Sequence, residues 1–372
     1  MKIAIHAADL DHKRIDGTRV YLLNMLNNFG LIKTKNEFDV YHHNQFNPEL
    51  TPPIFPNYIV KKAYAPFFWT QTCFAWRLFW DKPDVLWMPV HNIPIFRRKS
   101  LKVVVTIHDL AFKIFPEYFP QKDLKKLNRL SDLAIKNADR IIAVSDSTKN
   151  DILKFYPEVL PENVVVVHHG FDTKLFSSKI DEAKQIETLS RFKIQDSKFV
   201  LYVGAIQPRK NLEVLIEAFD EIKKKHGDLK LVFAGAPAWN HEGVFEKIQS
   251  SEHRDDIVVT GILSFEELRL IYGSAKVFVF PSLYEGFGIP VLEAFASDVP
   301  AILADNSSLP EVAGNAALYF KTGDSSDLAV QLERVLGDEA LRQRLISAGR
   351  LRAQEFSWSK CAKQTLDNIT KW

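Results

Sequence analysis

The sequence is poor in cysteine, with Cys73 and Cys361 as its two thiols. Two cysteines are too few for a disulfide framework or a cysteine metal site, and they fit a reducing compartment. The sequence also lacks an uninterrupted apolar run of about 18 residues, which argues against a transmembrane helix. The N-terminal stretch Met1–His6 has no apolar signal-peptide core. These absences lead us to expect a cytoplasmic protein.

Neither sign of charge is in large excess. The 48 basic and 46 acidic residues leave a formal net charge of +2, whereas a dedicated nucleic-acid-binding protein usually carries a clear basic surplus. We therefore expect no nucleic-acid partner. The chain has 372 residues, of which 46% are hydrophobic. This length and composition predict about two globular domains with substantial cores.

Strand-like and helix-like patterns alternate along the chain in two series. The first series of strands comprises Lys2–His6, Asp84–Met88, Val103–Ile107, Arg140–Val144 and Val164–His168, and the second comprises Phe199–Val203, Leu229–Phe233, Asp256–Val259, Lys276–Phe280 and Pro300–Leu303. Such alternation predicts parallel sheets with right-handed crossovers, so we expect an α/β fold with two doubly wound domains. The polar segment Asp172–Ser197 shows no clear strand, and we assign the linker to it.

The most informative stretch is 281–293, which reads Pro-Ser-Leu-Tyr-Glu-Gly-Phe-Gly-Ile-Pro-Val-Leu-Glu. It follows a predicted buried strand and leads into a helix that we expect to begin at Pro290. The loop should therefore lie at the carboxyl end of a parallel strand, where open α/β sheets bind ligands. Backbone N–H groups around Gly288 and Ile289 would point out of the helix N-terminus, which suits an anion such as phosphate.

Glu285 and Glu293 flank this turn. A carboxylate accepts hydrogen bonds from neighbouring hydroxyl groups, as on a ribose or a hexose. The alternative is that Glu293, which we expect in the first helical turn, only complements the helix dipole and that Glu285 is a solvated loop residue. The glycine turn, the proline and the preceding strand favour the ligand site over this alternative.

Arg209 and Lys210 form a second candidate element. They follow the predicted strand Phe199–Val203 and precede a helix that begins near Asn211. Arginine can bind two phosphate oxygens at once, and lysine supplies a mobile point charge. A solvated basic loop is the alternative. Beside the motif at 281–293 we favour phosphate binding.

The predicted first domain offers weaker candidates. Gly17 precedes an amphipathic helix and would let backbone amides approach a phosphate. His108 and Asp109 end a strand, where a lone histidine is more often structural and where Asp109 could cap the following turn. We interpret His168 and His169 as structural, because no carboxylate or cysteine lies at metal-binding spacing.

Together these stretches closely resemble the signature of retaining glycosyltransferases of family four, whose GT-B fold has two facing Rossmann-like domains. The matching stretches are 281–293, the loop 204–211, which is similar to the family's diphosphate loop, the first-domain motifs 106–110 and 143–148, and 301–312. The resemblance covers most of the chain. Around Gly17 the chain departs from it, because the family pattern has more glycines there.

The resemblance implies an acceptor-binding domain over residues 1–180, a nucleotide-sugar-binding domain over 181–356, and a final helix over 357–372 that packs back on the first domain. It implies a retaining, metal-independent transfer in polysaccharide biosynthesis, with no cofactor beyond the sugar nucleotide. The donor expected first is GDP-mannose, and the acceptor a glycan or a lipid-linked saccharide. A nucleotide-sugar epimerase and a non-catalytic nucleotide-sugar-binding protein remain the alternatives.

The same resemblance implies roles for the candidate residues. Arg209, Lys210 and the helix that starts near Gly288 would stabilise the leaving diphosphate. Glu293 would bind the ribose diol, Glu285 hydroxyls of the transferred sugar, and His108 would lie beside that sugar. The donor-binding set is Gly17, Gly286, Phe287, Gly288, Ile289 and Glu293.

The segment 61–80 is rich in aromatic residues and also carries Lys61, Lys62 and Arg77. One interpretation is an ordinary core helix, because its apolar residues lie nearly all round the helix. The other is an acceptor-binding or membrane-contact surface, where aromatic and cationic side chains meet an interface. We favour packing, and we keep peripheral contact with the inner membrane face as the alternative.

Overall fold

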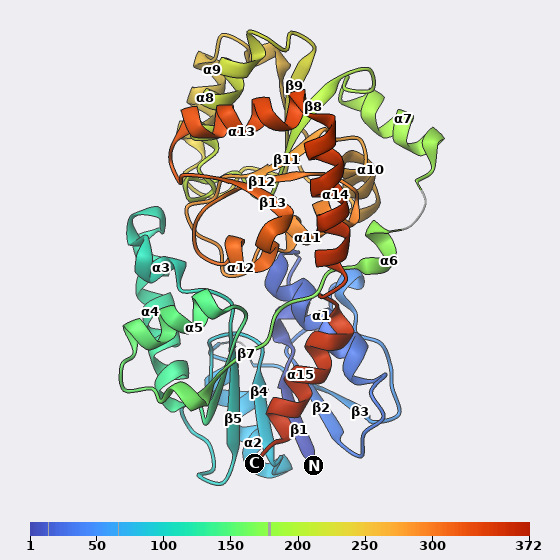
Figure 1. Ribbon diagram of the computed structural model, residues 1–372. Helices are drawn as coiled ribbons and strands as arrows, with labels where there is room; N and C mark the ends of the chain where they lie inside the picture. Colours follow the sequence, from blue (N-terminus) through green and yellow to red (C-terminus); the bar gives the residue numbers. More distant parts are fainter. Residues whose placement is uncertain (14, 66, 178–179) are drawn as a thin grey trace. The chain divides into compact units, whose positions relative to one another are not determined.

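The computed structural model describes residues 1–13, 15–65, 67–177 and 180–372. Over these residues the chain forms two compact α/β units (Figure 1). The first unit comprises Met1–Pro116, Pro120–Gly170 and Trp358–Trp372, and the second comprises Glu117–Phe119 and Phe171–Ser357. Each unit has its own parallel sheet, so the predicted α/β class with two doubly wound domains is confirmed.

The first unit is built around a seven-stranded sheet with the order β3-β2-β1-β4-β5-β6-β7. Its strands are β1 (Lys2–His6), β2 (Glu37–His42), β3 (Tyr58–Lys62), β4 (Val85–Met88), β5 (Lys102–Ile107), β6 (Arg140–Ala143) and β7 (Val164–Val166). Its helices are α1 (Gly17–Phe29), α2 (Ala75–Asp81), α3 (Ala111–Ile114), α4 (Gln121–Asn137), α5 (Asp146–Phe155) and α15 (Trp358–Thr370). The central strands are buried on both faces, which explains their continuous apolar runs.

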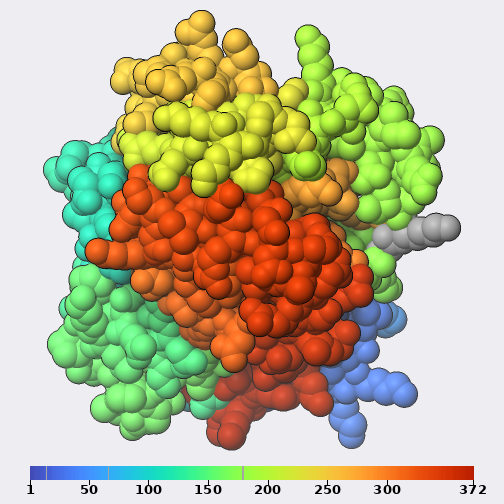
Figure 2. All heavy atoms as spheres, turned by 45° about the horizontal axis from the view of Figure 1, so that its top comes forward, coloured from blue at the N-terminus to red at the C-terminus, as the bar shows by residue number. Residues whose placement is uncertain are grey.

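The second unit has a six-stranded sheet with the order β10-β9-β8-β11-β12-β13. Its strands are β8 (Lys198–Val203), β9 (Leu229–Ala234), β10 (Ile257–Val259), β11 (Val277–Phe280), β12 (Ala301–Ala304) and β13 (Ala317–Phe320). Its helices are α6 (Thr173–Phe176), α7 (Glu182–Arg191), α8 (Leu212–Lys223), α9 (Glu242–Ser250), α10 (Phe265–Tyr272), α11 (Ile289–Ala296), α12 (Leu309–Ala313), α13 (Ser325–Gly337) and α14 (Glu339–Ala353). Figure 2 shows the yellow surface of α8 bordering the orange-red surface of α13.

All ten predicted strands are present, with ends that differ by up to two residues. Three further strands, β2, β3 and β13, were not predicted. The reason is clearest in β2, whose sequence places Asp39 among apolar residues. Asp39 is fully buried and pairs with Lys61 at 2.8 Å and with Lys2 at 3.3 Å. A charge that is paired inside the fold is indistinguishable from a solvated charge in the sequence, so it interrupts the apolar pattern.

The assignment of Asp172–Ser197 as a linker is wrong. The segment contains α6 and α7, and both belong to the second unit. Asp181 caps α7 by accepting the backbone N–H groups of Ala183 and Lys184. Gln185 then ties α7 to the end of α10, because its Nε2 donates to Ser274 Oγ at 2.7 Å. The polar composition reflects the exposed face of an amphipathic helix rather than an unstructured connection.

The C-terminal helix α15 packs on α1 in the first unit, as predicted (Figure 1). The Cys361 Sγ lies 3.9 Å from the Met25 Sδ on α1, and the Trp358 and Tyr21 rings are 6.1 Å apart. Arg140 at the start of β6 holds the end of the chain, because its guanidinium lies 4.7 Å from the centre of the Trp372 ring. The last thirteen helical residues therefore complete the core of the unit in which the chain begins.

The aromatic segment divides into two faces. Trp69, Phe74 and Leu78 are buried, which agrees with the packing interpretation. Trp76 and Trp80 on α2 are 64% and 61% exposed, so for them that interpretation is wrong. Among the described residues, no helix combines the length and apolar character that crossing a bilayer requires.

The contact between α15 and α1 generates the first prediction. Leu366 on α15 is 5% exposed, whereas Leu351 on α14 is 67% exposed. Leu366→Ala should lower the free energy of unfolding of the first unit by about 2–5 kcal/mol, because it leaves a cavity in a packed core. The matched Leu351→Ala change should cost less than about 0.5 kcal/mol. Urea titrations followed by tryptophan fluorescence measure both, and equal effects would contradict the docking of α15.

Candidate functional site

The loop 281–288 connects the carboxyl end of β11 to the start of α11. Gly288 has a φ of +107°, in the left-handed region, and a Cβ added to it would lie 3.1 Å from Leu309 Cδ2. Glycine is therefore required both by the backbone conformation and by the space. Pro290 is the second residue of α11 and needs no N–H partner there. The first backbone N–H groups of α11 follow directly from this turn.

Two serines from the loop after β12 support the turn. The hydroxyl of Ser308 lies 2.7 Å from the carbonyl oxygen of Phe287 and 3.0 Å from that of Glu285, and it donates to them. The backbone N–H of Glu285 donates to Ser307 Oγ at 3.0 Å. Sequence reasoning placed both serines in a matching motif but gave them no role. The structure shows that they fix the backbone on which Glu285 and Gly286 lie.

Arg209, Lys210 and Glu285 form one cluster in the second unit. The Lys210 Nζ lies 2.5 Å from Glu285 Oε1, and Arg209 Nη1 lies 3.6 Å from Glu285 Oε2. The Arg209 guanidinium also donates to the carbonyl oxygen of Tyr284. The backbone adds to this connection, since the N–H of Leu283 donates to the Arg209 carbonyl oxygen at 2.9 Å. The loops after β8 and β11 are thus joined by both charge and backbone.

The cluster is buried, with Lys210 and Glu285 each 8% exposed. Burial opposes ionisation of Glu285, but the charges of Lys210 and Arg209 outweigh it and hold the pKa of the carboxyl below its usual range. Two cations and one carboxylate leave a net positive charge at the carboxyl edge of the sheet. Such a site attracts an anion, and the N-terminus of α11 adds backbone donors beside it.

Glu293 is the fifth residue of α11, because the helix begins at Ile289 and not at Pro290. It therefore lies beyond the first turn, and the dipole explanation loses its basis. The hydroxyl of Tyr272 lies 3.1 Å from Glu293 Oε2. Desolvation raises the pKa of the Glu293 carboxyl to about 7. The hydrogen bond from Tyr272 lowers this pKa, and the charge of Asp172 raises it by a smaller amount. Glu293 thus titrates near neutral pH, whereas Glu285 stays ionised.

His108 follows β5 in the first unit. Its Nε2 lies 2.9 Å from the carbonyl oxygen of Pro89, which can only accept, so this nitrogen carries the proton. Burial lowers the pKa of His108, so the ring is neutral and its Nδ1 is an acceptor. Asp109 accepts the backbone N–H of Ala111 at 3.0 Å, and its predicted capping of the following turn is confirmed.

Gly17 is the first residue of α1, and Asp16 caps that helix. The Asp16 side chain accepts the backbone N–H of Arg19 at 3.3 Å and forms an ion pair with the Arg19 guanidinium. Apart from its chain neighbours and the backbone of α1, no atom of the described residues lies within 4 Å of a Cβ built at Gly17, so the backbone there leaves space for a ligand. A carboxylate already occupies part of the helix N-terminus, however, and phosphate binding at Gly17 stays a prediction.

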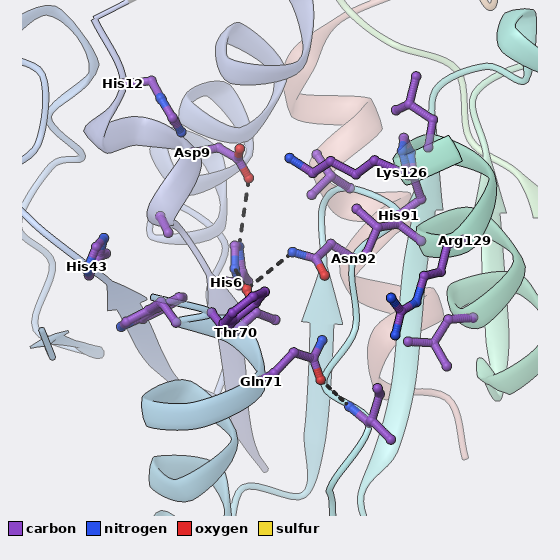
Figure 3. A pocket seen from close by; sticks show the side chains of 18 of the residues that line it. His6, Asp9, His12, His43, Thr70, Gln71, His91, Asn92, Lys126 and Arg129 are labelled. Atoms are coloured by element: carbon purple, nitrogen blue, oxygen red, sulfur yellow. Dashed lines mark hydrogen bonds and ion pairs between the residues drawn. The ribbon is translucent and has the colours of Figure 1, made fainter. Parts of the chain in front are cut away.

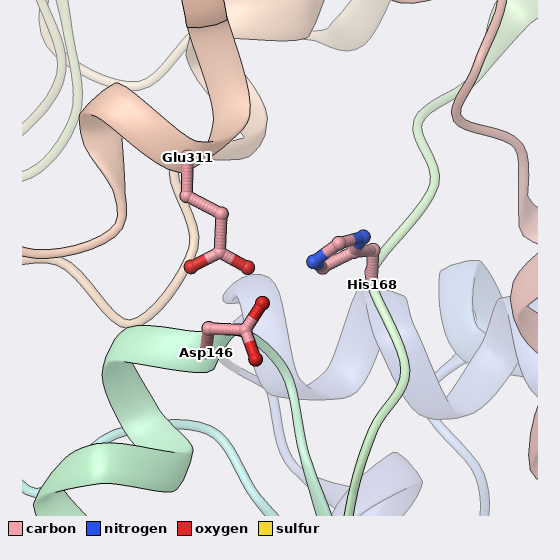
Figure 4. Close-up of side chains that lie close together, drawn as sticks. All are labelled: Asp146, His168 and Glu311. Atoms are coloured by element: carbon pink, nitrogen blue, oxygen red, sulfur yellow. The ribbon is translucent and has the colours of Figure 1, made fainter.

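The two histidines after β7 differ in their surroundings. His169 is buried, and its ring lies 4.8 Å from that of Tyr21 and 5.2 Å from that of His108. His168 lies near Asp146 at the start of α5, with ligand atoms of the two within 4.8 Å of each other (Figure 4). A carboxylate thus lies near His168, although it is 22 positions away in the sequence and escaped our spacing argument.

The first unit also contains a pocket of about 870 Å³ at the carboxyl ends of β1, β2 and β4, which sequence reasoning missed (Figure 3). We call it the polar pocket. Its lining includes His6, Asp9, Asp11, His12, His43, Thr70, Gln71, His91, Asn92, Lys126 and Arg129. The signal that could have found it is His6 at the end of β1, because ligands bind at the carboxyl ends of parallel strands.

Hydrogen bonds order the floor of the polar pocket. The hydroxyl of Thr70 joins His6 Nε2 at 3.3 Å and accepts from Asn92 Nδ2 at 3.2 Å (Figure 3). Desolvation lowers the pKa of His6 and brings that of His91 to about 4, so both rings are neutral at neutral pH. The floor of the pocket therefore offers uncharged donors and acceptors, which suit hydroxyl groups of a saccharide. Charged side chains line the pocket as well, namely Asp9, Asp11, Lys126 and Arg129.

The family models agree with this geometry. Residues 16–175 match the model of Glycosyltransferase Family 4, and residues 184–352 match that of Glycosyl transferases group 1. These matches favour the transferase over the epimerase hypothesis. The first match ends and the second begins near the boundary between the two units.

Relatives and solved structures extend the comparison. O-antigen chain mannosyltransferase B of Escherichia coli is 28% identical over 72% of this chain and 69% of its own length. The serotype-specific mannosyltransferase WbdA of Escherichia coli is 28% identical over 76% of this chain but only 34% of its own length. Anabaena Alr3699/HepE, solved with UDP and glucose, has the same fold, with a TM-score of 0.75 at 15% identity and full coverage of both chains. Two family models that together follow the chain through both units show that it belongs to the family-four glycosyltransferases.

Proposed function

We propose that the enzyme transfers a hexose from a nucleotide-diphosphate sugar to a saccharide with retention of the anomeric configuration. The observation that carries this proposal is the buried cluster of Arg209, Lys210 and Glu285 beside the N-terminus of α11. It combines a net positive charge for a diphosphate with a carboxylate for sugar hydroxyls. Glu293, on the same helix, supplies a second carboxylate for the ribose diol.

The leaving diphosphate gains negative charge as the glycosidic bond breaks. Arg209, Lys210 and the first N–H groups of α11 would meet that charge with groups that are already in place, which is the efficient form of electrostatic catalysis. These groups can do the work of a divalent cation, so we propose that the transfer needs no metal. The remaining donor contacts fall to the backbone of Gly286, Phe287, Gly288 and Ile289.

Glu285 can serve both the cations and the sugar. An ionised carboxylate accepts about four hydrogen bonds, and Lys210 takes one of these positions on Oε1. Arg209 lies 3.6 Å from Oε2, and we propose that hydroxyls of the transferred hexose use the positions that the two cations leave. Because the cations keep its pKa low, Glu285 stays an acceptor throughout.

We propose front-face transfer, because among the described residues no side chain is an obvious nucleophile for the double displacement that would also give retention. The acceptor hydroxyl oxygen attacks the anomeric carbon on the face from which the diphosphate leaves, and its proton passes to the departing phosphate oxygen. Neutral His108 presents Nδ1 as an acceptor, which suits contact with a hydroxyl of the hexose. We propose the first unit as the acceptor-binding part, with the polar pocket holding a glycan or the saccharide of a lipid-linked acceptor.

GDP-mannose is the donor that we propose first. Its support is the similarity to O-antigen chain mannosyltransferase B. UDP-glucose is the competing donor, because Alr3699/HepE was solved with UDP and glucose. A thermal-shift screen over a panel of nucleotide sugars separates them, since a ligand that binds only the folded protein raises its apparent stability.

The stereochemistry tests the proposed function. An α-linked donor should give an α-linked product, and His108→Ala should lower activity without changing that outcome. An inverting enzyme needs a general base on the opposite face of the sugar. Proton NMR of fresh product reads the anomeric coupling. A β-linked product would overturn retention and make His108 or Asp109 the base.

Replacing both cations by alanine should lower turnover more than nucleotide affinity, because the charge that they meet grows in the transition state. We expect kcat of Arg209→Ala/Lys210→Ala to fall by about 10²-fold or more, as when a donor to the developing charge is removed. The assays contain EDTA, in which the wild type should keep its full activity. Lys224→Gln/Lys225→Gln, at exposed positions, is the control. Loss of wild-type activity in EDTA, restored by Mg²⁺, would contradict metal independence.

Glu293 should strengthen nucleotide binding and lower the stability of the folded state. Its pKa is about 7 in the folded state against an ordinary value of 4.5, so its contribution to stability is present at low pH and is lost as pH rises toward 7. Glu293→Gln should therefore raise the free energy of unfolding by up to about 3 kcal/mol at pH 8 and by far less at pH 5. The same change should weaken nucleotide binding about 10- to 100-fold, through loss of a charge-assisted hydrogen bond.

Denaturant titrations at the two pH values and calorimetry with the nucleotide measure these effects. The exposed Glu252→Gln is the matched control and should change neither quantity. A pH-independent effect of Glu293→Gln on stability would show that the carboxyl is not desolvated. Unchanged nucleotide affinity would remove Glu293 from the donor site.

A further inference from the structure

Exposed aromatic side chains are concentrated in one part of the first unit. Of the nine strongly exposed aromatic residues among those that the structure describes, seven lie between positions 64 and 96. They are Tyr64, Phe67, Phe68, Trp76, Phe79, Trp80 and Phe96, with exposures between 54% and 81%. Single exposed apolar residues are common, but a gathering of this kind marks an interaction surface.

The helix α2 shows how this surface arises. Phe74, Ala75 and Leu78 point into the unit, whereas Trp76, Phe79 and Trp80 lie on the other side at the spacing of one helical face. The rings of Trp76 and Trp80 are 5.7 Å apart. The helix is thus apolar on both faces, and only one of them is covered by the fold.

A groove connects this face with the next loop. It has a volume of about 740 Å³, and Trp76, Phe79 and Phe96 line it together with Arg97. We call the surface formed by Trp76, Phe79, Trp80 and Phe96 the aromatic face. Gln71 lines both this groove and the polar pocket, so the two adjoin.

The charges around the aromatic face have one sign. Residues 61–100 contain seven basic side chains and two acidic ones, although the whole chain is almost balanced. The basic residues are Lys61, Lys62, Arg77, Lys82, Arg97, Arg98 and Lys99. One acidic residue, Asp81, is already paired with Lys61 at 2.8 Å, and the other, Asp84, accepts a backbone N–H. Aromatic side chains flanked by cations match the headgroup region of an anionic bilayer.

We propose that the aromatic face docks on an anionic lipid surface, with Trp76, Phe79 and Phe96 entering the headgroup region and Arg77 and Lys99 meeting lipid charges. Side chains that enter only the headgroup region hold a protein reversibly, so the proposed attachment is peripheral. Docking would bring the adjoining polar pocket to the membrane surface. If the proposed transfer is correct, this position favours a saccharide that is carried on a lipid.

Vesicle co-sedimentation tests the docking without any donor or acceptor. The full-length protein should bind vesicles of phosphatidylcholine and phosphatidylglycerol at 3:1 and bind pure phosphatidylcholine more weakly. Trp76→Ser/Phe79→Ser/Phe96→Ser should lower partitioning onto the anionic vesicles at least tenfold. Phe265→Ser, which changes a 50% exposed aromatic side chain on α10, is the matched control and should bind like the wild type.

A second pair of variants tests how much the basic side chains contribute to vesicle binding. Arg77→Gln/Lys99→Gln should lower binding to anionic vesicles about fivefold for each cation that meets the lipid, and leave binding to neutral vesicles unchanged. Lys224→Gln/Lys225→Gln should have no effect. All variants change exposed side chains, so circular dichroism and nucleotide calorimetry should be those of the wild type.

Three results would overturn the proposal. The wild type could fail to bind anionic vesicles, the aromatic variant could bind as well as the wild type, or the aromatic variant could dissociate a dimer in analytical ultracentrifugation. The last result would assign the aromatic face to a second copy of the chain. A failure of the transferase proposal would be seen in a different measurement, as absent nucleotide binding by the wild type. The two proposals can therefore fail independently.

Discussion

The ion pair between Lys210 and Glu285 joins the loops that follow β8 and β11, which are neighbouring strands of the second sheet. Taking both charges out of water costs free energy that their attraction roughly offsets, so the pair adds little net stability. It nevertheless fixes the relative positions of two loops, because the buried charge on each loop is offset by a charge on the other loop. The second cation, Arg209, makes the cluster positive and thus ready for an anion.

Two carboxylates in this unit are held in different states by their surroundings. Glu285 has two cations as neighbours and a lowered pKa, whereas Glu293 has a tyrosine hydroxyl and a pKa of about 7. One environment therefore keeps an acceptor permanently charged, and the other charges it only near neutral pH. Such divergence of pKa between nearby carboxyl groups is typical of functional sites. The desolvated Glu293 is a cost in stability that a purely structural residue would not carry.

In the first unit, the polar pocket and the aromatic face occupy adjoining but different parts of the surface. The polar pocket lies at the carboxyl ends of β1, β2 and β4, where desolvation lowers the pKa of His6 and of His91. The aromatic face begins at α2, and basic side chains flank it. The shared residue Gln71 is fixed by hydrogen bonds to the backbone of Ile93 and Ile95. The side chain of Gln71 thus lies at a fixed position between the proposed lipid-binding surface and the proposed saccharide pocket.

The sequence by itself determined the alternation of strands and helices, the glycine turn at 281–293, and the placement of Arg209 and Lys210 after a buried strand. These features depend on local periodicity, on backbone conformations that only glycine adopts easily, and on the rule that loops follow strands at one edge of a parallel sheet. Because local chemistry decides these features, they can be predicted from a single sequence.

Only the tertiary structure decided that Lys210 pairs with Glu285, that Glu293 is desolvated, and that His6, Thr70 and Asn92 line one pocket. It also decided which aromatic residues of 61–80 pack and which stay exposed, because the helix is apolar all round and the fold covers one side. Burial and pairing depend on residues that are tens of positions apart in the chain. The energies of burial and pairing depend on neighbours that only folding brings together. The local sequence pattern around a residue therefore does not predict these energies.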